Sequence, residues 1–188
     1  PSGTNWNDSW KIGVATSRKP AEGFKVKGYI EGMDPLIDPC VFVDDDGQAY
    51  IYNGGGGLCK GGKLKDNMME LDGPMQTMEG LEDFHEATWI HKYNGKYYML
   101  SSGCTGWDPN IAEIAVADSI MGTWKTIGNP CTGPDADKTF YAQSTYMQPI
   151  IGKKDAYIAM FDRWKKKDLE DSRYVWLPVL IKDGAITI

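Results

Sequence analysis

Tight-turn signals recur along this chain, and each separates two short runs rich in Val, Ile, Tyr and Phe. These signals are Asp46-Gly47, Asn94-Gly95, Lys153-Lys154-Asp155 and Asp183-Gly184. Asp-Gly and Asn-Gly tolerate the positive φ angles that close turns between antiparallel strands require, and β-branched and aromatic residues favour strands. No stretch shows sustained helical periodicity. The pattern therefore predicts an all-β fold built from hairpins.

The turns return every ~45–60 residues, which is close to the length of one blade of a β-propeller. A strand followed by a turn and a Gly-aromatic strand also occurs twice, at 12–25 and at 114–125. We predict a single, partial β-propeller domain over residues 1–188. Its parts are a partial blade at 1–30 and blades at 36–80, 84–131 and 140–188. A β-sandwich is the structural alternative, but it would not require this long repeat.

Charge and aromatic content narrow the classes of partner. The net charge of −6 argues against a nucleic-acid footprint, and no apolar run reaches the length of a membrane span. Seven Trp and ten Tyr are many for 188 residues. They indicate a core of aromatic-rich strands, a surface that stacks on carbohydrate, or both. We therefore expect neither nucleic acid nor membrane as a partner.

The cysteines show no metal-binding spacing. None of Cys40, Cys59, Cys104 and Cys131 forms a Cys-x-x-Cys pair, so no metal site is predicted. Two interpretations stay open: four buried free thiols, or a Cys104–Cys131 disulfide within one blade.

Two carboxylates stand at the starts of strand–turn–strand units. Asp38 precedes Pro39, and Glu86 precedes the largely apolar run 87–89. A propeller directs such positions into its central pocket, and glycosidases need a pair of carboxyl groups. Burial of Glu86 would raise its pKa and keep a proton available. The alternatives are a surface glutamate at a strand start and an aspartate in a turn.

Two groups of motifs carry a family resemblance. The first lies at 10–17, 37–39, 44–47 and 85–86, and the second at 102–110, 143–145, 162–164 and 171–178. With these motifs the chain resembles glycoside hydrolase family 43, five-bladed propellers that cleave plant cell-wall glycans with inversion. Residues 1–100 are similar to the xylosidase and arabinofuranosidase branches, and residues 101–188 to the exo-β-1,3-galactanase branch.

The resemblance implies a glycosidase that cleaves xylosidic, arabinofuranosidic or β-1,3-galactosidic bonds from chain ends. Glu86 matches the general acid, and Asp38 matches the acidic residue that orients the acid and tunes its pKa. Gln143 lies in a segment similar to the galactanase branch, where a glutamine stands near the attacking water. An amide is a poor base, so this third catalytic assignment is the weakest chemically.

Six further residues are candidates for binding the sugar. They are His85, Trp89, Trp107, Arg163, Trp164 and Arg173. An aromatic ring packs on the C–H face of a sugar, and a guanidinium binds hydroxyl or carboxylate oxygens. The alternative for each Trp is core packing, and for Arg173 it is a structural contact with Asp171.

One departure from the family puts catalysis in doubt. Members usually carry their general-base Asp on the first strand of blade one, whereas this chain begins inside that blade, and a fifth blade is not visible. Asp8, in a loop-like polar run, is the early carboxylate that could be mistaken for the base. We therefore expect about three and a half of five blades. A non-catalytic carbohydrate-binding propeller, or a gene fragment, is the alternative function.

The resemblance also bears on cofactors, partners and location. It implies no required cofactor, although family members can hold a structural calcium ion on the propeller axis. The expected partner is a plant cell-wall oligosaccharide or polysaccharide. Such a substrate favours a secreted or periplasmic protein.

Overall fold

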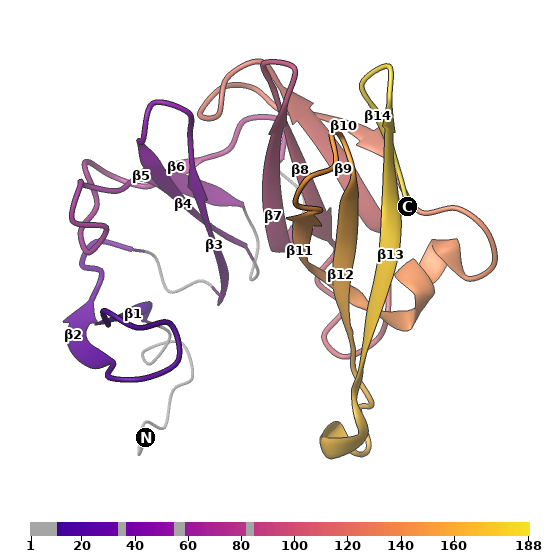
Figure 1. Cartoon of the computed structure of the whole chain (residues 1–188), viewed down its shortest axis with the longest axis horizontal. Coiled ribbons are helices and arrows are strands. Elements are labelled where there is room, and N and C mark those ends of the chain that lie inside the picture. The colour runs from indigo at the N-terminus through magenta and orange to yellow at the C-terminus, as the bar shows by residue number, and fades with distance from the viewer. Residues whose placement is uncertain (1–10, 34–36, 55–58, 82–84) are drawn as a thin grey trace.

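The computed structural model describes residues 11–33, 37–54, 59–81 and 85–188. These residues form one two-stranded and three four-stranded antiparallel sheets (Figure 1). The two-stranded sheet contains β1 (Gly13–Thr16) and β2 (Lys25–Tyr29). The next contains β3 (Ile37–Val43), β4 (Ala49–Gly54), β5 (Lys60–Lys63) and β6 (Gln76–Thr77). The third contains β7 (Glu86–Tyr93), β8 (Lys96–Ser102), β9 (Ala112–Ala117) and β10 (Lys125–Gly128). The last contains β11 (Gln143–Pro149), β12 (Tyr157–Arg163), β13 (Arg173–Lys182) and β14 (Ala185–Thr187).

The strands of each sheet follow one another in sequence order, as in the blade of a propeller. The predicted turns connect them: Asn94 and Gly95 have φ of 48° and 76°, and Asp183 and Gly184 have φ of 52° and 79°. Two short 3-10 segments, η2 (Ala136–Tyr141) and η3 (Leu169–Asp171), connect strands of the C-terminal part. The described residues are thus almost entirely β, as the turn pattern predicted.

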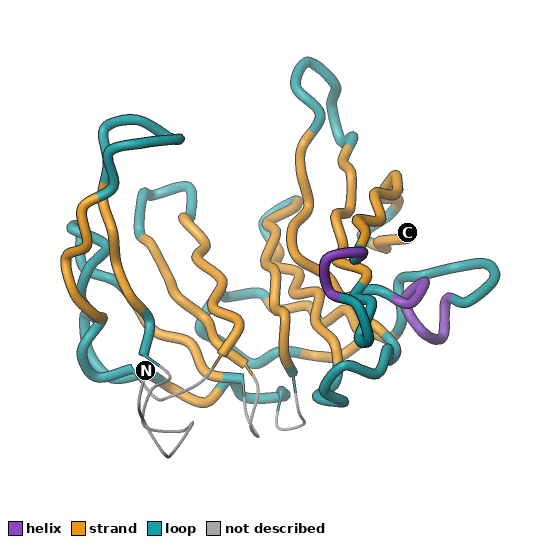
Figure 2. Tube along the Cα trace, turned by 90° about the horizontal axis from the view of Figure 1, so that it is seen from below, coloured by secondary structure: helices purple, strands orange, loops and turns teal. Residues whose placement is uncertain are grey.

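Successive sheets pack face to face, and each interface holds its own core (Figure 2). The core between the second and third sheets includes Tyr52, Met78, Met99 and Trp124. The core between the third and fourth sheets includes Trp89, Leu100, Ile114, Phe161 and Ile181. A sandwich would have one such interface between two sheets. The repeated interface therefore confirms the partial propeller, with three complete blades and the two-stranded β1–β2 unit among the described residues.

The first strand of each complete blade lies next to the first strand of the following blade. Strand β7 contacts β3 on one side and β11 on the other. Each of these inner strands changes register near its beginning: between Ile37 and Cys40, between Glu86 and Trp89, and between Ser144 and Tyr146. Such bulges bend a strand and change the direction of a side chain. They occur beside Asp38, Glu86 and Gln143.

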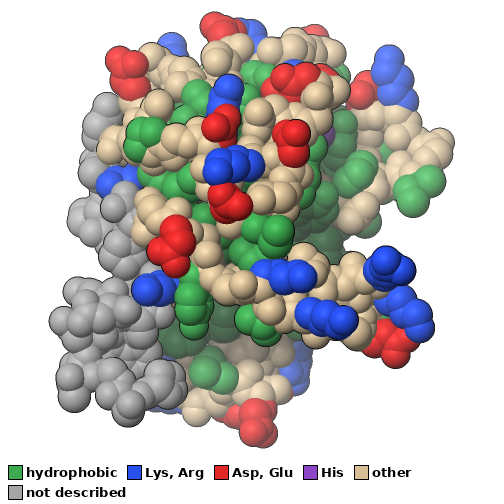
Figure 3. Space-filling view, turned by 90° about the vertical axis from the view of Figure 1, so that its left-hand side faces the viewer, with side chains coloured by type: hydrophobic (Ala, Val, Ile, Leu, Met, Phe, Trp, Pro, Cys, Tyr) green, Lys and Arg blue, Asp and Glu red, His purple; other side chains and the backbone are tan. Residues whose placement is uncertain are grey.

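The surface and the thiols bear on two further sequence predictions. On the face shown in Figure 3, acidic and basic side chains are mixed with apolar ones rather than separated into broad regions of one sign. No helix in the described part of the chain has the length and apolar character of a membrane span. None of the four cysteines forms a disulfide in this structure, so the Cys104–Cys131 pairing is not observed. Burial raises the pKa of the Cys131 thiol to about 11.

Gly54 ends β4 where the chain approaches the start of β7. A Cβ atom on Gly54 would lie 1.9 Å from the carbonyl oxygen of His85, the residue before Glu86. A backbone oxygen cannot move away without displacing the start of β7. This close approach explains why glycine occupies the position.

We expect Gly54→Ala to lower the free energy of unfolding by about 1–3 kcal/mol, as overpacking typically does. Denaturant unfolding of the variant would measure this loss. Gly13→Ala is the matched control, because a Cβ on Gly13 meets its nearest atom at 3.9 Å. Equal stability of the two variants would contradict the close packing of Gly54 against β7.

Candidate active site

The three inner strands each present one polar side chain near their beginning: Asp38 on β3, Glu86 on β7 and Gln143 on β11. Glu86 is only 8% exposed. Its Oε1 accepts a hydrogen bond from Gln143 Nε2 at 3.1 Å, and its carboxyl group also takes one from Cys104. The blade order thus brings together three residues that lie 48 and 57 positions apart in the chain.

Burial raises the pKa of Glu86, and the nearby charge of Asp38 raises it further. The hydrogen bonds from Cys104 and Gln143 oppose this effect but do not cancel it. A carboxyl group with a raised pKa holds its proton in the range where a general acid must donate one. The environment of Glu86 therefore suits an acid.

Asp38 is linked to Glu86 by a hydrogen bond with the backbone of Ala87, the residue that follows Glu86. The Ala87 N–H donates to the Asp38 carboxylate, and burial raises the pKa of Asp38 despite this bond. The Ala87 carbonyl accepts a hydrogen bond from Ser144 Oγ at 2.8 Å. Asp38 and Ala87 both have left-handed backbone, with φ of 53° and 51°. One residue thus connects the starts of β3, β7 and β11.

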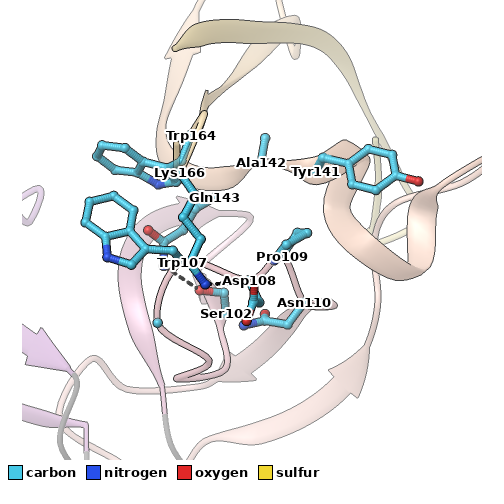
Figure 4. A pocket seen from close by; sticks show the side chains of 11 residues that line it. Ser102, Trp107, Asp108, Pro109, Asn110, Tyr141, Ala142, Gln143, Trp164 and Lys166 are labelled. Carbon is cyan, nitrogen blue, oxygen red and sulfur yellow. Dashed lines mark hydrogen bonds and ion pairs between the residues drawn. The ribbon is translucent and has the colours of Figure 1, made fainter. Parts of the chain in front are cut away.

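A cavity of about 250 Å³ opens beside Gln143 (Figure 4). Gln143 Nε2 also donates to Ser102 Oγ at 3.0 Å, at the base of the cavity. The rings of Trp107 and Trp164 lie on one side, edge to face, with centroids 5.2 Å apart. They are 48% and 44% exposed. At the rim, Lys166 Nζ forms an ion pair with Asp108 Oδ1 at 3.3 Å.

Two predicted sugar-binding residues, Trp89 and His85, are buried and do not line the cavity. Trp89 is 3% exposed in the core between the third and fourth sheets, and its ring stacks on His91 with centroids 5.7 Å apart. It offers no face to a sugar, which corrects the stacking assignment in favour of core packing. His85 is also 3% exposed, and its Nδ1 is hydrogen-bonded with Ser101 Oγ at 2.8 Å. It supports the strand start and does not line the cavity.

The two predicted arginines have structural partners. Arg163 donates from Nε and from a terminal nitrogen to the carbonyl oxygen of Phe140, at 3.0 and 2.5 Å. Arg173 forms an ion pair with Asp171, the contact that the sequence left open as an alternative. Both arginines border a second hollow, which shares Tyr141 and Trp164 with the cavity. Neither lies in the wall beside Gln143.

Sequence reasoning missed several residues of the site. These are Cys104 and Asp108 after β8, Tyr141 before β11 and Lys166 after β12. Cys104 and Asp108 fall within the motif at 102–110, so their position in the motif was an available signal. Nothing local marks Tyr141 or Lys166, because the packing of blades brings them to the cavity.

Two sequence predictions on bases and ions gain no support here. Asp8 lies outside the described residues. Within 11–33, 37–54, 59–81 and 85–188, no three His, Cys, Asp or Glu side chains gather as metal ligands would. A structural calcium ion stays an expectation from the family resemblance, and no step below uses one.

The fold and the site define a class: a β-propeller with two neighbouring carboxyl groups, one buried and one half-buried, near the beginnings of adjacent inner strands. The chain belongs to the glycosyl hydrolases family 43, whose family model matches residues 1–147. The sequence resemblance to this family is confirmed.

Characterised relatives support the membership. The chain is 31% identical to a β-xylosidase from Xylanibacter ruminicola, over 80% of this chain and 53% of the relative. It is 34% identical to a xylosidase/arabinosidase from Bacteroides ovatus, over 62% and 47%. The chain thus spans about half the length of these relatives.

Similar solved structures include several that act on β-1,3-galactosides. A family 43 β-1,3-galactosidase solved with galactodeoxynojirimycin is 42% identical over 80% of this chain and 45% of its own, with a TM-score of 0.74. A second β-1,3-galactosidase is 32% identical over 93% and 38%, with a TM-score of 0.88. The exo-β-1,3-galactanase of Phanerochaete chrysosporium with β-1,3-galactotriose is 29% identical over 95% and 41%, with a TM-score of 0.84.

The raised pKa of Glu86 predicts a pH-dependent cost to stability. A carboxyl group whose pKa is raised on folding binds more protons in the folded state, so stability falls as pH rises from its unfolded pKa through its folded pKa. Glutamine at this position does not titrate. We expect Glu86→Gln to raise the melting temperature relative to wild type more near pH 7 than near pH 4.

Calorimetry at both pH values measures the difference. Glu31→Gln is the control, since Glu31 lies on the surface. A Glu86→Gln effect that is independent of pH, or larger at low pH, would contradict the raised pKa.

Proposed function

We propose that this chain carries the general-acid side of an inverting glycoside hydrolase that removes β-1,3-linked galactose from the ends of plant cell-wall galactan. The observation that carries the proposal is the position of Glu86, which is buried, next to Asp38 and hydrogen-bonded to Gln143, a residue that lines an open cavity with aromatic walls. Proton donation to a leaving oxygen needs this combination of a raised pKa and access to substrate.

Glu86 donates its proton to the glycosidic oxygen as the bond to the anomeric carbon breaks. Asp38 disfavours early loss of that proton, because a second negative charge nearby costs energy. The Ala87 N–H keeps Asp38 oriented toward the acid. Trp107 and Trp164 form the hydrophobic wall against which the C–H face of a sugar packs.

Two observations favour galactan over xylan or arabinoxylan. The similar structures with 29–42% identity named above act on β-1,3-galactosides. The residues at the cavity, Trp107, Gln143 and Trp164, lie in the segments that resemble the galactanase branch. The named curated relatives are xylosidases and arabinosidases, so xylosides and arabinofuranosides are the competing substrates.

Inversion requires a base on the far side of the sugar, about 6.5–9.5 Å from the acid. Gln143 is hydrogen-bonded to Glu86 itself, and an amide accepts a proton poorly. Asp108, at the rim, is exposed and paired with Lys166. Neither group has the position and chemistry of a strong base. This arrangement favours a second candidate function, carbohydrate binding with weak or no hydrolysis.

The leaving group tests the acid. Relative to the turnover that the wild-type chain retains, we expect Glu86→Gln to reduce turnover of β-1,3-galactobiose by about 10²–10⁴-fold, the usual contribution of acid–base catalysis. Nitrophenyl galactoside should lose far less, because a good leaving group needs little protonation. Initial rates on both substrates measure the contrast. An equal loss on both would remove Glu86 from the role of acid.

Azide tests whether the chain has a general base for the attacking water. We expect the 188-residue chain to bind β-1,3-galactan but to hydrolyse it weakly, because the described residues at the cavity offer no strong base. Azide should accelerate cleavage by acting on the side of the sugar opposite Glu86. Rates with and without azide, and the anomer of the product, measure this effect. Nitrophenyl xyloside and arabinofuranoside are the comparison substrates.

The contrary outcomes are distinct. Full turnover without azide that is lost in Gln143→Ala would make Gln143 the base. Full turnover lost in Asp108→Asn would assign the base to Asp108. Binding without cleavage, even with azide, would favour the non-catalytic function.

A further inference from the structure

The segment before β11 has an unusual backbone. Thr139, Phe140 and Tyr141 are three consecutive non-glycine residues with positive φ, of 49°, 57° and 59°. Left-handed backbone is unfavourable for a non-glycine residue, because Cβ crowds the following carbonyl oxygen. Such a segment persists only where surrounding groups hold it.

Side-chain hydrogen bonds join this segment to two different blades. Thr139 is 1% exposed, and its Oγ1 donates to the carbonyl oxygen of Asn110, in the loop before β9. Arg163, at the end of β12, donates two hydrogen bonds to the carbonyl oxygen of Phe140. The Arg163 guanidinium also lies over the Tyr141 ring, 6.0 Å from its centroid. One guanidinium group, that of Arg163, thus holds the Phe140 carbonyl oxygen with two hydrogen bonds.

The segment leads directly into Gln143, which is hydrogen-bonded to Glu86 and Ser102. Ala142 returns to extended backbone, with φ of −136° and ψ of 168°, and Gln143 begins β11. Gln143 pairs in register with Asp162, the neighbour of Arg163 on β12. Gln143 lies only two residues after Tyr141. A change in the backbone of the turn at 139–141 therefore shifts the position of the Gln143 side-chain amide.

We propose that Arg163 is a positioning residue. By holding the Phe140 carbonyl, it fixes the left-handed turn and keeps the Gln143 amide in contact with Glu86 and Ser102. This role differs from the sugar contact that the sequence suggested for Arg163. Its catalytic meaning rests on the proposed function, whereas the contacts themselves do not.

The geometry requires arginine rather than any cation. Two N–H groups of one guanidinium reach a single carbonyl oxygen, while its central carbon lies 6.0 Å from the centroid of the Tyr141 ring. Lysine offers a point charge on a flexible stem and cannot reproduce both contacts. Arg163→Lys should therefore behave like Arg163→Ala in part, although the charge is retained.

The test is a double-substitution cycle that reads the titration of Glu86 by carboxyl NMR. It uses the whole chain as wild type, Arg163→Ala, Gln143→Ala and the double variant. The groups that face Glu86 are Asp38 from β3, Cys104 after β8 and Gln143 from β11. Of these, only Gln143 is linked to Arg163 through the turn.

We expect Gln143→Ala to raise the pKa of Glu86, because a hydrogen bond to the ionised form is lost. Arg163→Ala should raise it in the same direction, and the double variant should match Gln143→Ala. Arg163→Lys should give an intermediate shift. Arg18→Ala, in the loop between β1 and β2, should leave the titration unchanged.

Three results would overturn the proposal. These are a wild-type Glu86 titration in Arg163→Ala, fully additive shifts in the double variant, and complete recovery in Arg163→Lys. If Arg163→Ala unfolds, Arg163→Gln, which keeps one amide donor, takes its place in the cycle. The titration needs no turnover, so a chain that fails to hydrolyse galactan would contradict the proposed function and leave this result intact.

Discussion

The site depends on the backbone of one residue, Ala87. Its N–H donates to Asp38 on β3, its carbonyl accepts from Ser144 on β11, and the residue before it is Glu86. A backbone group shielded from water is costly to leave without a hydrogen bond, so these two bonds hold all three inner strands together at this point. The left-handed conformation of Ala87 and the bulge in β7 allow both bonds while Glu86 points toward Gln143.

This arrangement links stability to chemistry. The contacts that hold the blades together also bury Glu86 and Asp38, and burial raises the pKa of both carboxyl groups. A carboxyl group whose pKa is raised on folding lowers the stability of the folded state as the pH rises through that pKa. In the proposed function, the same shift favours the protonated form of Glu86 that donates to the leaving oxygen. Active sites commonly combine strained backbone, buried charge and useful reactivity in this way.

Short-range signals in the sequence predicted much of this structure. Asn94-Gly95 and Asp183-Gly184 gave the hairpins because their positive φ is a local property. The bulges were not predictable, since they depend on how β3, β7 and β11 meet. Because a shift of one residue moves a side chain to the other face of a strand, the sequence could not place Trp89 in the core. The hydrogen bond from Arg163 to the Phe140 carbonyl was likewise not predictable, because it depends on a turn that residues distant in the sequence hold in place.

The most direct test is a crystal structure of this chain with β-1,3-galactobiose. We expect the glycosidic oxygen to lie within hydrogen-bond reach of the Glu86 carboxyl group, at about 2.6–3.2 Å. We also expect one sugar ring to pack on Trp107 or Trp164. A disaccharide bound with its glycosidic oxygen away from Glu86, or bound outside the cavity beside Gln143, would contradict the account.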